Sequence, residues 1–490
     1  MSFIHNIRTV AKYEARILRR SWFFRLFSIG ALTIFTFMNI GLFSPVGEEG
    51  WEIISISSSV PHINLYLLNI GQALIVIFLA ADFLKRDKKL DTNEVLYTRS
   101  MSNFEYVSGK TTGILRLFLS LDIVILSIAL IINIISKRME VDILSYLWYL
   151  LLICLPTIIF SLGLAFMMMS VIRNQAITFL ILLGIAALDM FWLWYRAGFI
   201  FDYMAFGLPL FKSGIIGFDD PGLILSQRGF YLCLGLALIF ATVLLFKRLP
   251  QSKIHTALSV ILLVVFTAGA GFCGFNVMKT WKKNKDSKNR VIEVNRRYED
   301  VLFAALTDAQ IDCRHKGETI EATARLKFTN DNPAGIDRYV FSLNPGLAVS
   351  AVTSNGQALV FKRINHIIEI DRDSILHPGC TDSLTITYSG TIDENFCFPD
   401  HNENYNVTPY RMEMLNINKR QAFLRDDYVL LTPETHWYPV PGLNYYPSNP
   451  ARIKTDFIRF SLRVRTDSRL VPVAQGTMKK EDGAVIFENE

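Results

Sequence analysis

Few residues of this 490-residue chain stand where they could do chemistry. Two acids, Asp122 and Asp189, lie inside long apolar runs. A carboxylate is costly to bury within a bilayer, so an acid in such a run marks a functional site by default. The alternative is a structural acid that hydrogen-bonds a neighbouring helix or lines a water-filled crevice. We favour that alternative, because the sequence shows no partner for either acid.

No complete catalytic constellation accompanies these acids. The sequence has no Gly-x-x-x-x-Gly-Lys-Ser/Thr for nucleotide phosphates, no His-Glu-x-x-His for zinc and no Gly-x-Ser-x-Gly for a nucleophilic serine. We therefore predict no catalytic residue, no cofactor and no metal ligand in these residues. Any peptidase chemistry would need a further domain downstream.

A polar, charge-rich segment between two apolar runs determines the predicted orientation of the chain in the membrane. Six Lys or Arg lie between Lys85 and Lys110. Short loops rich in Lys and Arg stay on the cytoplasmic side of a membrane. The sequence therefore predicts an inner loop here, with a membrane span on each side.

The apolar residues, which belong to a hydrophobic fraction of 51%, crowd into the first 278 positions. Runs of this length predict membrane spans. We expect seven, at about 24–43, 64–82, 113–135, 146–169, 176–195, 230–246 and 258–278. The connection 198–228 is broken by Gly and Pro and could hold a re-entrant or surface-lying helix. An extra crossing there would reverse the orientation of all that follows.

The first helix and the loops set the predicted orientation. Residues 3–22 read as an amphipathic helix with a basic face suited to the inner membrane surface, opposite an apolar face that includes Ala11, Leu18 and Trp22. Seven crossings from a cytoplasmic N-terminus place residue 279 onward outside. The basic run after Lys279 argues against this, but long domains translocate largely regardless of charge. We expect a multi-pass protein of a bacterial inner membrane.

In the last third of the chain the apolar side chains recur with a different period. Residues 320–328, 384–388 and 458–465 alternate apolar and polar side chains, which predicts half-buried antiparallel strands. Turn signals such as Asn355-Gly356 separate them. The predicted fold is thus an α-helical polytopic membrane domain followed by an all-β, sandwich- or saddle-like extracytoplasmic domain.

The cysteine spacing argues against a metal cluster, and the origin of the net charge argues against nucleic-acid binding. Cys313, Cys380 and Cys397 in the β part match no metal spacing; outside the cytoplasm one disulfide is possible, with the pairing open. The formal net charge of +6 comes from basic residues that lie mostly beside the spans, so nucleic acid is not an expected partner.

The membrane half resembles permease subunits of ABC transporters of the type-2 exporter class. The resemblance covers about residues 1–255 and is carried by the basic stretch from Lys12 to Arg20 and by the loop from Arg86 to Lys110. It implies that the loop carries a coupling helix that docks on a separate ATPase, and that permeases pair as homo- or heterodimers in the bilayer. The coupling residues it implies are Arg86, Asp87, Asp91, Thr92, Glu94 and Lys110.

The second half resembles the N-terminal β domain of zinc aminopeptidases of the aminopeptidase N type. Three stretches carry this resemblance: 352–356, 376–390 and 431–439. It implies a β domain over 307–490, joined to the permease by a seventh span and stalk at 256–306, with the catalytic domain absent. By the same resemblance, Glu434 is a candidate contact to a substrate amino terminus.

Three functions remain open at this point. The first is an ABC-type export permease with an accessory peptidase-like domain. The second is a membrane-anchored zinc aminopeptidase fragment without its catalytic domain, and the third is a non-catalytic binding module. We favour the first, because seven spans and a charged inner loop exceed what a tether needs.

Overall fold

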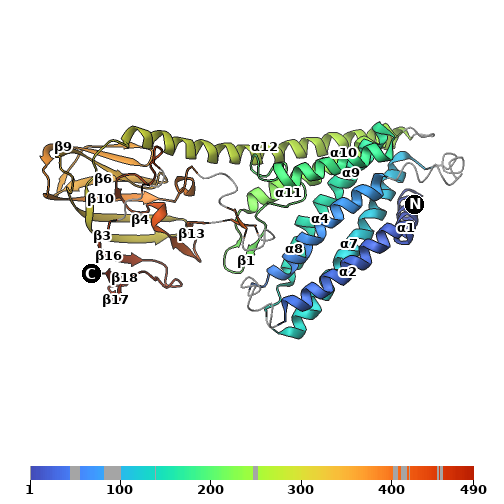
Figure 1. The fold of residues 1–490 in the computed structure, drawn as a ribbon, viewed down its shortest axis with the longest axis horizontal. Helices are drawn as coiled ribbons and strands as arrows, with labels where there is room; N and C mark the ends of the chain where they lie inside the picture. The colour runs from blue at the N-terminus through green and yellow to red at the C-terminus, as the bar shows by residue number, and fades with distance from the viewer. Residues whose placement is uncertain are drawn as a thin grey trace. The chain divides into compact units, whose positions relative to one another are not determined.

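The chain consists of a helical part followed by a β part (Figure 1). The computed structural model describes residues 2–44, 56–81, 101–137, 139–246, 252–400, 407–409, 416–418, 420–449, 452 and 456–489. Residues up to Trp281 form most of one compact unit, the helical unit, and those from Lys282 onward form most of a second, the β unit. The predicted bounds of three domains stay a prediction.

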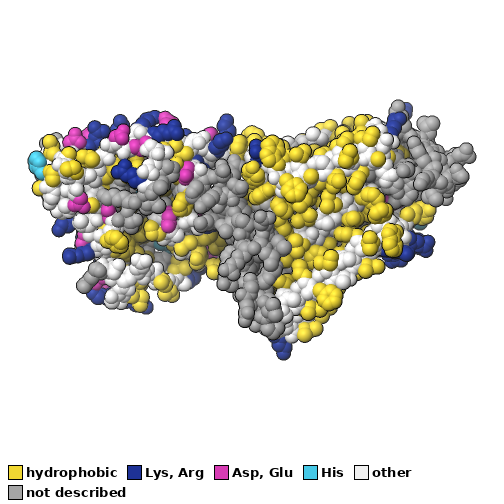
Figure 2. Space-filling model, viewed as in Figure 1, with side chains coloured by type: hydrophobic (Ala, Val, Ile, Leu, Met, Phe, Trp, Pro, Cys, Tyr) yellow, Lys and Arg dark blue, Asp and Glu magenta, His cyan; other side chains and the backbone are white. Residues whose placement is uncertain are grey.

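Seven helices of the described residues are long and apolar enough to cross a membrane, in agreement with the predicted number. They run over Trp22–Leu42 (α2), Ser59–Ala80, Asn103–Ser136 (α7), Ile143–Ile172, Gln175–Leu193, Pro221–Leu245 (α11) and Lys253–Tyr298. Hydrophobic side chains cover the helical unit on the face in view, whereas Lys, Arg, Asp and Glu are scattered over the β unit (Figure 2). The second of these helices is α4, which as a whole runs over Ser59–Ala81, and α1 (Ser2–Arg20) comes before the first.

Two of the predicted spans contain irregular turns. The fourth consists of α8 (Ile143–Tyr149), the π-helical turn η2 (Leu150–Cys154) and α9 (Leu155–Ile172). The fifth consists of α10 (Gln175–Leu188) and the π-helical turn η3 (Asp189–Leu193). A π turn shifts the hydrogen-bond register and is found frequently at functional sites.

Two predictions of local structure are wrong. The connection 194–220 holds no helix; it contains turns and a hairpin of β1 (Lys212–Ser213) and β2 (Gly217–Phe218), and α11 already begins at Pro221. The predicted stalk is not a separate element either. One helix, α12 (Lys253–Tyr298), includes both the seventh span and the stalk.

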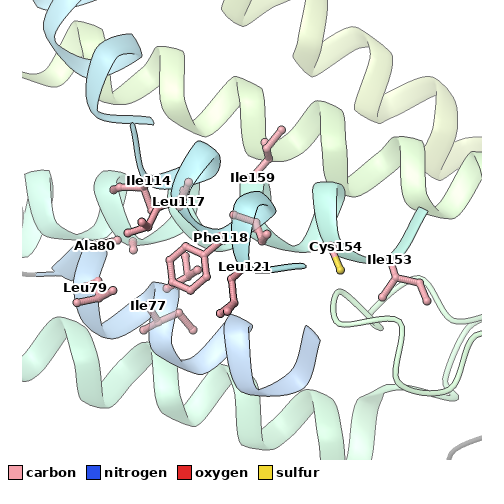
Figure 3. Packing of buried hydrophobic residues seen from close by; sticks show 14 of the residues in the cluster. Ile77, Leu79, Ala80, Ile114, Leu117, Phe118, Leu121, Ile153, Cys154 and Ile159 are labelled. Carbon is pink, nitrogen blue, oxygen red and sulfur yellow. The ribbon is translucent and has the colours of Figure 1, made fainter. Parts of the chain in front are cut away.

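The core of the helical unit lies where α4, α7 and α9 meet. Phe118 and Leu121 of α7 are buried with Ile77 and Leu79 of α4, and η2 contributes Ile153 to the same cluster (Figure 3). Helices α9 and α11 approach each other most closely at Gly163 and Gly235, where a β-carbon on either residue would overlap the other helix. Small residues allow such close packing between membrane helices.

The β unit contains a mixed eight-stranded sheet in the order β17-β18-β16-β3-β4-β10-β6-β7. Its strands are β3 (Ala305–Lys316), β4 (Thr319–Thr329), β6 (Leu347–Ser354), β7 (Gln357–Ala358), β10 (Thr381–Gly390), β16 (Arg459–Arg465), β17 (Thr477–Glu481) and β18 (Ala484–Asn489). The three predicted strands are present. The expectation that all are antiparallel is wrong for β16, which pairs parallel to β3.

A second sheet supplies the other side of the β core. It has the order β15-β5-β9-β8, with β5 (Ile336–Ser342), β8 (Phe361–Ile364), β9 (Ile367–Leu376) and β15 (Val440–Pro441). Phe328 of β4 packs edge-to-face on Tyr339 and Phe341 of β5. Short pairs β11 (Val407–Pro409) with β12 (Asn416–Asn418) and β13 (Ala422–Leu424) with β14 (Val429–Leu431) lie outside these sheets.

Candidate functional site: a buried arginine cluster

Arg228 of α11 is the largest fully buried side chain of the structure, at 2% exposure. Its Nε donates to the carbonyl oxygen of Leu152 at 2.6 Å, and Nη1 donates to that of Tyr203 at 3.1 Å. Nη2 donates to the carbonyl of Ile153 at 3.0 Å and to Oγ1 of Thr157 at 2.7 Å. Four hydrogen bonds therefore hold the guanidinium between the fourth span and the connection 194–220.

The sequence explains why these carbonyls are available. Residue 156 is a proline, which has no N–H to donate to the carbonyl of Leu152 four positions earlier. The π turn η2 over Leu150–Cys154 changes the register at the same place. Arg228 supplies the donor that Pro156 lacks. The buried cation thus satisfies the carbonyls that the irregular helix leaves without a partner, and those carbonyls in turn stabilise the cation.

Helix α11 starts early enough to bring Arg228 inside. Asp220 is its N-cap, and the carboxylate accepts from the N–H of Leu223 at 2.9 Å, with Pro221 in the first turn. Proline at this position needs no hydrogen-bond partner for its nitrogen. These two residues set the helix start and put Arg228 two turns further along.

Asp202 organises the connection that faces Arg228. Its carboxylate accepts from the backbone N–H groups of Phe206 at 2.6 Å, Gly207 at 2.8 Å and Leu208 at 2.9 Å. The neighbouring Gln227 donates to the carbonyls of Phe199 and Asp202 at 2.9 and 2.6 Å. The connection is thus a folded loop whose backbone is held by side-chain hydrogen bonds.

Both predicted intramembrane acids are buried, and they differ in their surroundings. Asp122 is fully buried and accepts a hydrogen bond from Gln72 of α4. Asp189, at the start of η3, faces the N–H groups of Tyr203 and Met204 without good hydrogen-bond geometry. It is one of two carboxylates that attract the Arg228 guanidinium electrostatically. The other is Asp202. Asp189 therefore belongs to the Arg228 cluster.

The hairpin of the connection is tied to the beginning of the fourth span. Lys212 Nζ lies 2.5 Å from Oδ2 of Asp142, and Ser145 Oγ is 3.1 Å from the same ammonium. Burial raises the pKa of Asp142, but the hydrogen bonds from Lys212 and Ser145 and the charge of Lys212 outweigh it and hold the pKa below its usual value. The loop before α8 and the connection 194–220 thus meet at one end of the helical unit.

The predicted coupling residue Lys110 lies in a buried contact between α1 and α7. Its Nζ is 3.6 Å from Oε2 of Glu14, and both side chains are under 5% exposed. Asn6 of α1 also donates to Glu105 at 2.9 Å, and Glu105 forms a capping box with Ser102. The apolar side of α1 packs on α7, and its residues Ala11 and Leu18 are buried.

The remaining predicted residues are not part of these clusters. Arg86, Asp87, Asp91, Thr92 and Glu94 lie outside the described residues. Glu434 is exposed in a short 3₁₀ turn, Pro433–Thr435, and its carbonyl accepts from the thiol of Cys397 at 3.4 Å. All six cysteines are free thiols. Among the described residues, no group of three His, Cys, Asp or Glu could hold a metal ion.

The outer face of the eight-stranded sheet forms a broad polar hollow of about 780 Å³. Its lining comes from β3, β4, β6, β10, β16 and β18 and includes Arg314, Arg325, Arg463 and Arg465. Arg465 pairs with Asp312 at 2.7 Å. This hollow was not predicted from the sequence, because it arises only when the strands lie in this order.

Sequence reasoning also missed Arg228 and Asp202. Both were placed in the connection before a sixth span that was expected to begin at residue 230. The signals that could have found Arg228 are Asp220 followed by Pro221, which mark a helix start. No comparable signal points to Asp202.

No family model and no curated protein matches this sequence. Comparison with solved structures finds an M1 zinc metallopeptidase from Deinococcus radiodurans, at 18% identity and a TM-score of 0.27, over 38% of this chain and 39% of that one. A mutant of that enzyme bound to a Tyr-Ser-Ala substrate gives 16% identity and a TM-score of 0.28 over the same shares. Native yeast LTA4 hydrolase gives 12% and 0.24, over 38% of this chain and 26% of its own. The aligned parts are well under half of these enzymes.

Proposed function

We propose that this chain is a membrane-embedded permease subunit of an ABC-type export system that works with a separate ATPase. The loop at 84–110 would face the cytoplasm and dock on the ATPase, and the β unit would lie on the extracytoplasmic side. The permease would act as a homo- or heterodimer in a bacterial inner membrane.

The observation that carries the proposal is the packing of α1 on the beginning of α7, directly after the charged loop. A β-carbon on Gly109 would lie 2.6 Å from that of Val10, so the two helices touch through their backbones. The buried Glu14–Lys110 pair and the Asn6–Glu105 hydrogen bond fix their register. A push on the loop would therefore move α1 and α7 together.

The length of α7 supports the same reading. Its 34 residues span about 51 Å at 1.5 Å per residue, whereas the hydrocarbon layer is about 30 Å thick. About 21 Å of α7, or about four turns, would extend beyond the hydrocarbon, and the α1 contact lies at the N-terminal end of the helix. Asn103 there also donates to the carbonyl of Phe246 at the end of α11, at 2.6 Å. One end of the unit is thus a rigid platform built from three helices.

The test is ATPase coupling. We expect the chain to co-purify with an ATPase encoded beside it and to raise its ATP hydrolysis in proteoliposomes. Asp91→Arg and Glu94→Arg should abolish that stimulation because they reverse charges on the proposed docking loop. The matched control is Asp219→Arg, an acid of the connection at the opposite end of the neighbouring spans.

Two outcomes would contradict the proposal. One is unchanged stimulation by the two loop variants. The other is equal loss in a folded Asp219→Arg control, which would show that the loss is not specific to the proposed docking loop.

The polar hollow of the β unit favours an additional role for that unit. An open sheet face with four arginines and interspersed acids suits recognition of a polar partner. We therefore assign the β unit an accessory binding role. Removing residues from 305 onward should leave ATPase stimulation intact; a peptidase anchored by passive spans would show no such stimulation at all.

A further inference from the structure

We propose that α1 carries a binding surface for anionic phospholipid headgroups. The surface, here named the α1 basic face, is formed by Arg8, Lys12, Arg16, Arg19 and Arg20, all of which are exposed. The inference rests on the proposed membrane insertion of the helical unit and does not depend on an ATPase.

The five basic side chains are concentrated on one side of the helix. At 3.6 residues per turn their positions fall within an arc of about 120°. The only acid of α1 is Glu14, which is 2% exposed and paired with Lys110 on the opposite side. The α1 basic face therefore presents positive charge that no acid of its own helix neutralises.

The opposite side of α1 is already occupied. Ala11 and Leu18 are buried, and Val10 and Ala11 touch the glycines of α7. An amphipathic helix that lies free on a membrane inserts its apolar side into the acyl region. Here that side is used for packing, so binding to lipid would be through charge and hydrogen bonds to phosphate oxygens.

Continuity with α2 places the C-terminal end of this face at the level of the headgroups. Only Ser21 separates α1 from α2, and α2 begins with Trp22 and Phe23, which are 72% and 50% exposed. Ile29, Ile34 and Phe37 continue the exposed apolar side of the same span, which suits contact with acyl chains. The junction between the helices therefore lies where acyl chains give way to phosphates, the depth that tryptophan favours.

Charge complementarity selects the ligand. A basic side chain near an anionic membrane surface strengthens binding about fivefold. Arginine also forms paired hydrogen bonds to phosphate oxygens, and four of the five residues are arginines. A zwitterionic headgroup offers the same phosphate without net charge, so the preference is for anionic over zwitterionic lipid.

The experiment counts lipids on the purified full chain. The chain is equilibrated in detergent micelles that contain equal amounts of phosphatidylglycerol and phosphatidylcholine, and native mass spectrometry records the bound lipids. The test variant is Arg8→Gln with Lys12→Gln and Arg16→Gln. We expect wild type to retain phosphatidylglycerol preferentially and the triple variant to lose most of that preference, by about fivefold for each charge removed.

The matched control removes three positive charges from the β unit, with Lys316→Gln, Lys362→Gln and Lys480→Gln, all exposed positions. It should retain phosphatidylglycerol as wild type does. Millimolar inorganic phosphate should not displace the lipid, whereas displacement would show a site for free anions and overturn the assignment.

Other results would also overturn it. Equal retention by the α1 variant and wild type would exclude the α1 basic face. A triple variant that keeps its lipids but, in a separate purification, no longer binds the ATPase would assign this face to the protein partner. Because lipids are counted without an ATPase present, failure here leaves the coupling test of the proposed function untouched.

Discussion

The helical unit and the β unit bury polar side chains in different ways. Around Arg228 a full charge is buried, with three backbone carbonyls and a hydroxyl as acceptors and two carboxylates nearby. Around His366 of the β unit the fully buried side chains are neutral, and the cation beside them, Arg363, is half-buried and donates to the carbonyls of His366, Leu343 and Asn344. His366 Nε2 lies 2.6 Å from Oδ1 of Asn295, and Asn295 Nδ2 donates to the carbonyl of Tyr445 at 2.7 Å.

The difference follows from what each backbone can offer. A regular helix uses its carbonyls internally, so a buried arginine among helices needs a break such as η2 with Pro156. The loops at the end of a sheet leave amides and carbonyls free, so polar side chains, including Arg363, bind there without a break in a regular element. A buried charge among packed helices therefore marks a place where a regular helix is interrupted.

The largest effect should come from Arg228→Ala. It leaves two carboxylates and the freed carbonyls without their cation, and breaking such buried pairs costs about 3–5 kcal/mol. We expect a clear drop in the thermal unfolding midpoint in detergent and early hydrogen exchange in 194–220. Arg116→Ala, an exposed arginine of α7, is the control and should behave as wild type. Equal behaviour of both variants would mean that Arg228 does not hold the connection.

A smaller effect should follow from Asn295→Ala in the β unit. It removes the partner of Nε2 of His366 and of the carbonyl of Tyr445, which costs about 1–3 kcal/mol for buried neutral groups. Hydrogen exchange measured by mass spectrometry should rise around 295, 366 and 445 and stay unchanged in the helical unit. The contrast between charged and neutral clusters fails if this variant is as damaging as Arg228→Ala.

The neutral cluster should also be sensitive to acid. Burial, with smaller effects of Arg363 and His436, lowers the pKa of His366 to about 3. Because this folded-state value is below the ordinary value of about 6.5, the unfolded chain binds the extra proton as pH falls. From pH 7 to pH 5 the β unit should lose about 2 kcal/mol through this residue.

Denaturation of the β unit followed at both pH values measures this loss. His366→Gln, which cannot take up a proton, should remove this contribution to the pH dependence and leave that of His436. An unchanged slope in that variant would show that another group carries it, with His436, whose pKa burial lowers to about 4, as the next to test.

The smallest effect concerns the start of α11. Asp220→Ala removes the N-cap of α11, whose carboxylate accepts from the N–H of Leu223. Such a cap typically contributes about 1 kcal/mol to the stability of the fold. We expect the first turn of α11 to fray. Protection from hydrogen exchange should fall modestly around Phe199 and Asp202, whose carbonyls accept hydrogen bonds from Gln227. Asp220→Ser should restore most of it, and failure of that rescue would point to the charge instead of the cap.

The sequence predicts the coarse architecture well because its signals are long. Seven apolar runs and the alternation in 320–328 survive any local irregularity. It fails where one residue changes the local register. Pro221 moves the start of α11 nine residues earlier than expected, and the parallel pairing of β16 with β3 depends on contacts over a long sequence distance. The Arg228 cluster combines four separated segments, so single-sequence patterns could identify its acid Asp189 but not its centre.

The most direct test of the central claim is the side of the membrane on which each unit lies. Cys380 is the exposed native cysteine of the β unit, so intact cells are treated with a membrane-impermeant maleimide. The second reporter is Tyr97→Cys in a Cys380→Ser background. The account predicts that Cys380 is labelled in intact cells and that the loop cysteine reacts only after the cells are opened. Labelling of the loop in intact cells, with Cys380 protected, would contradict a permease whose charged loop meets an ATPase inside the cell.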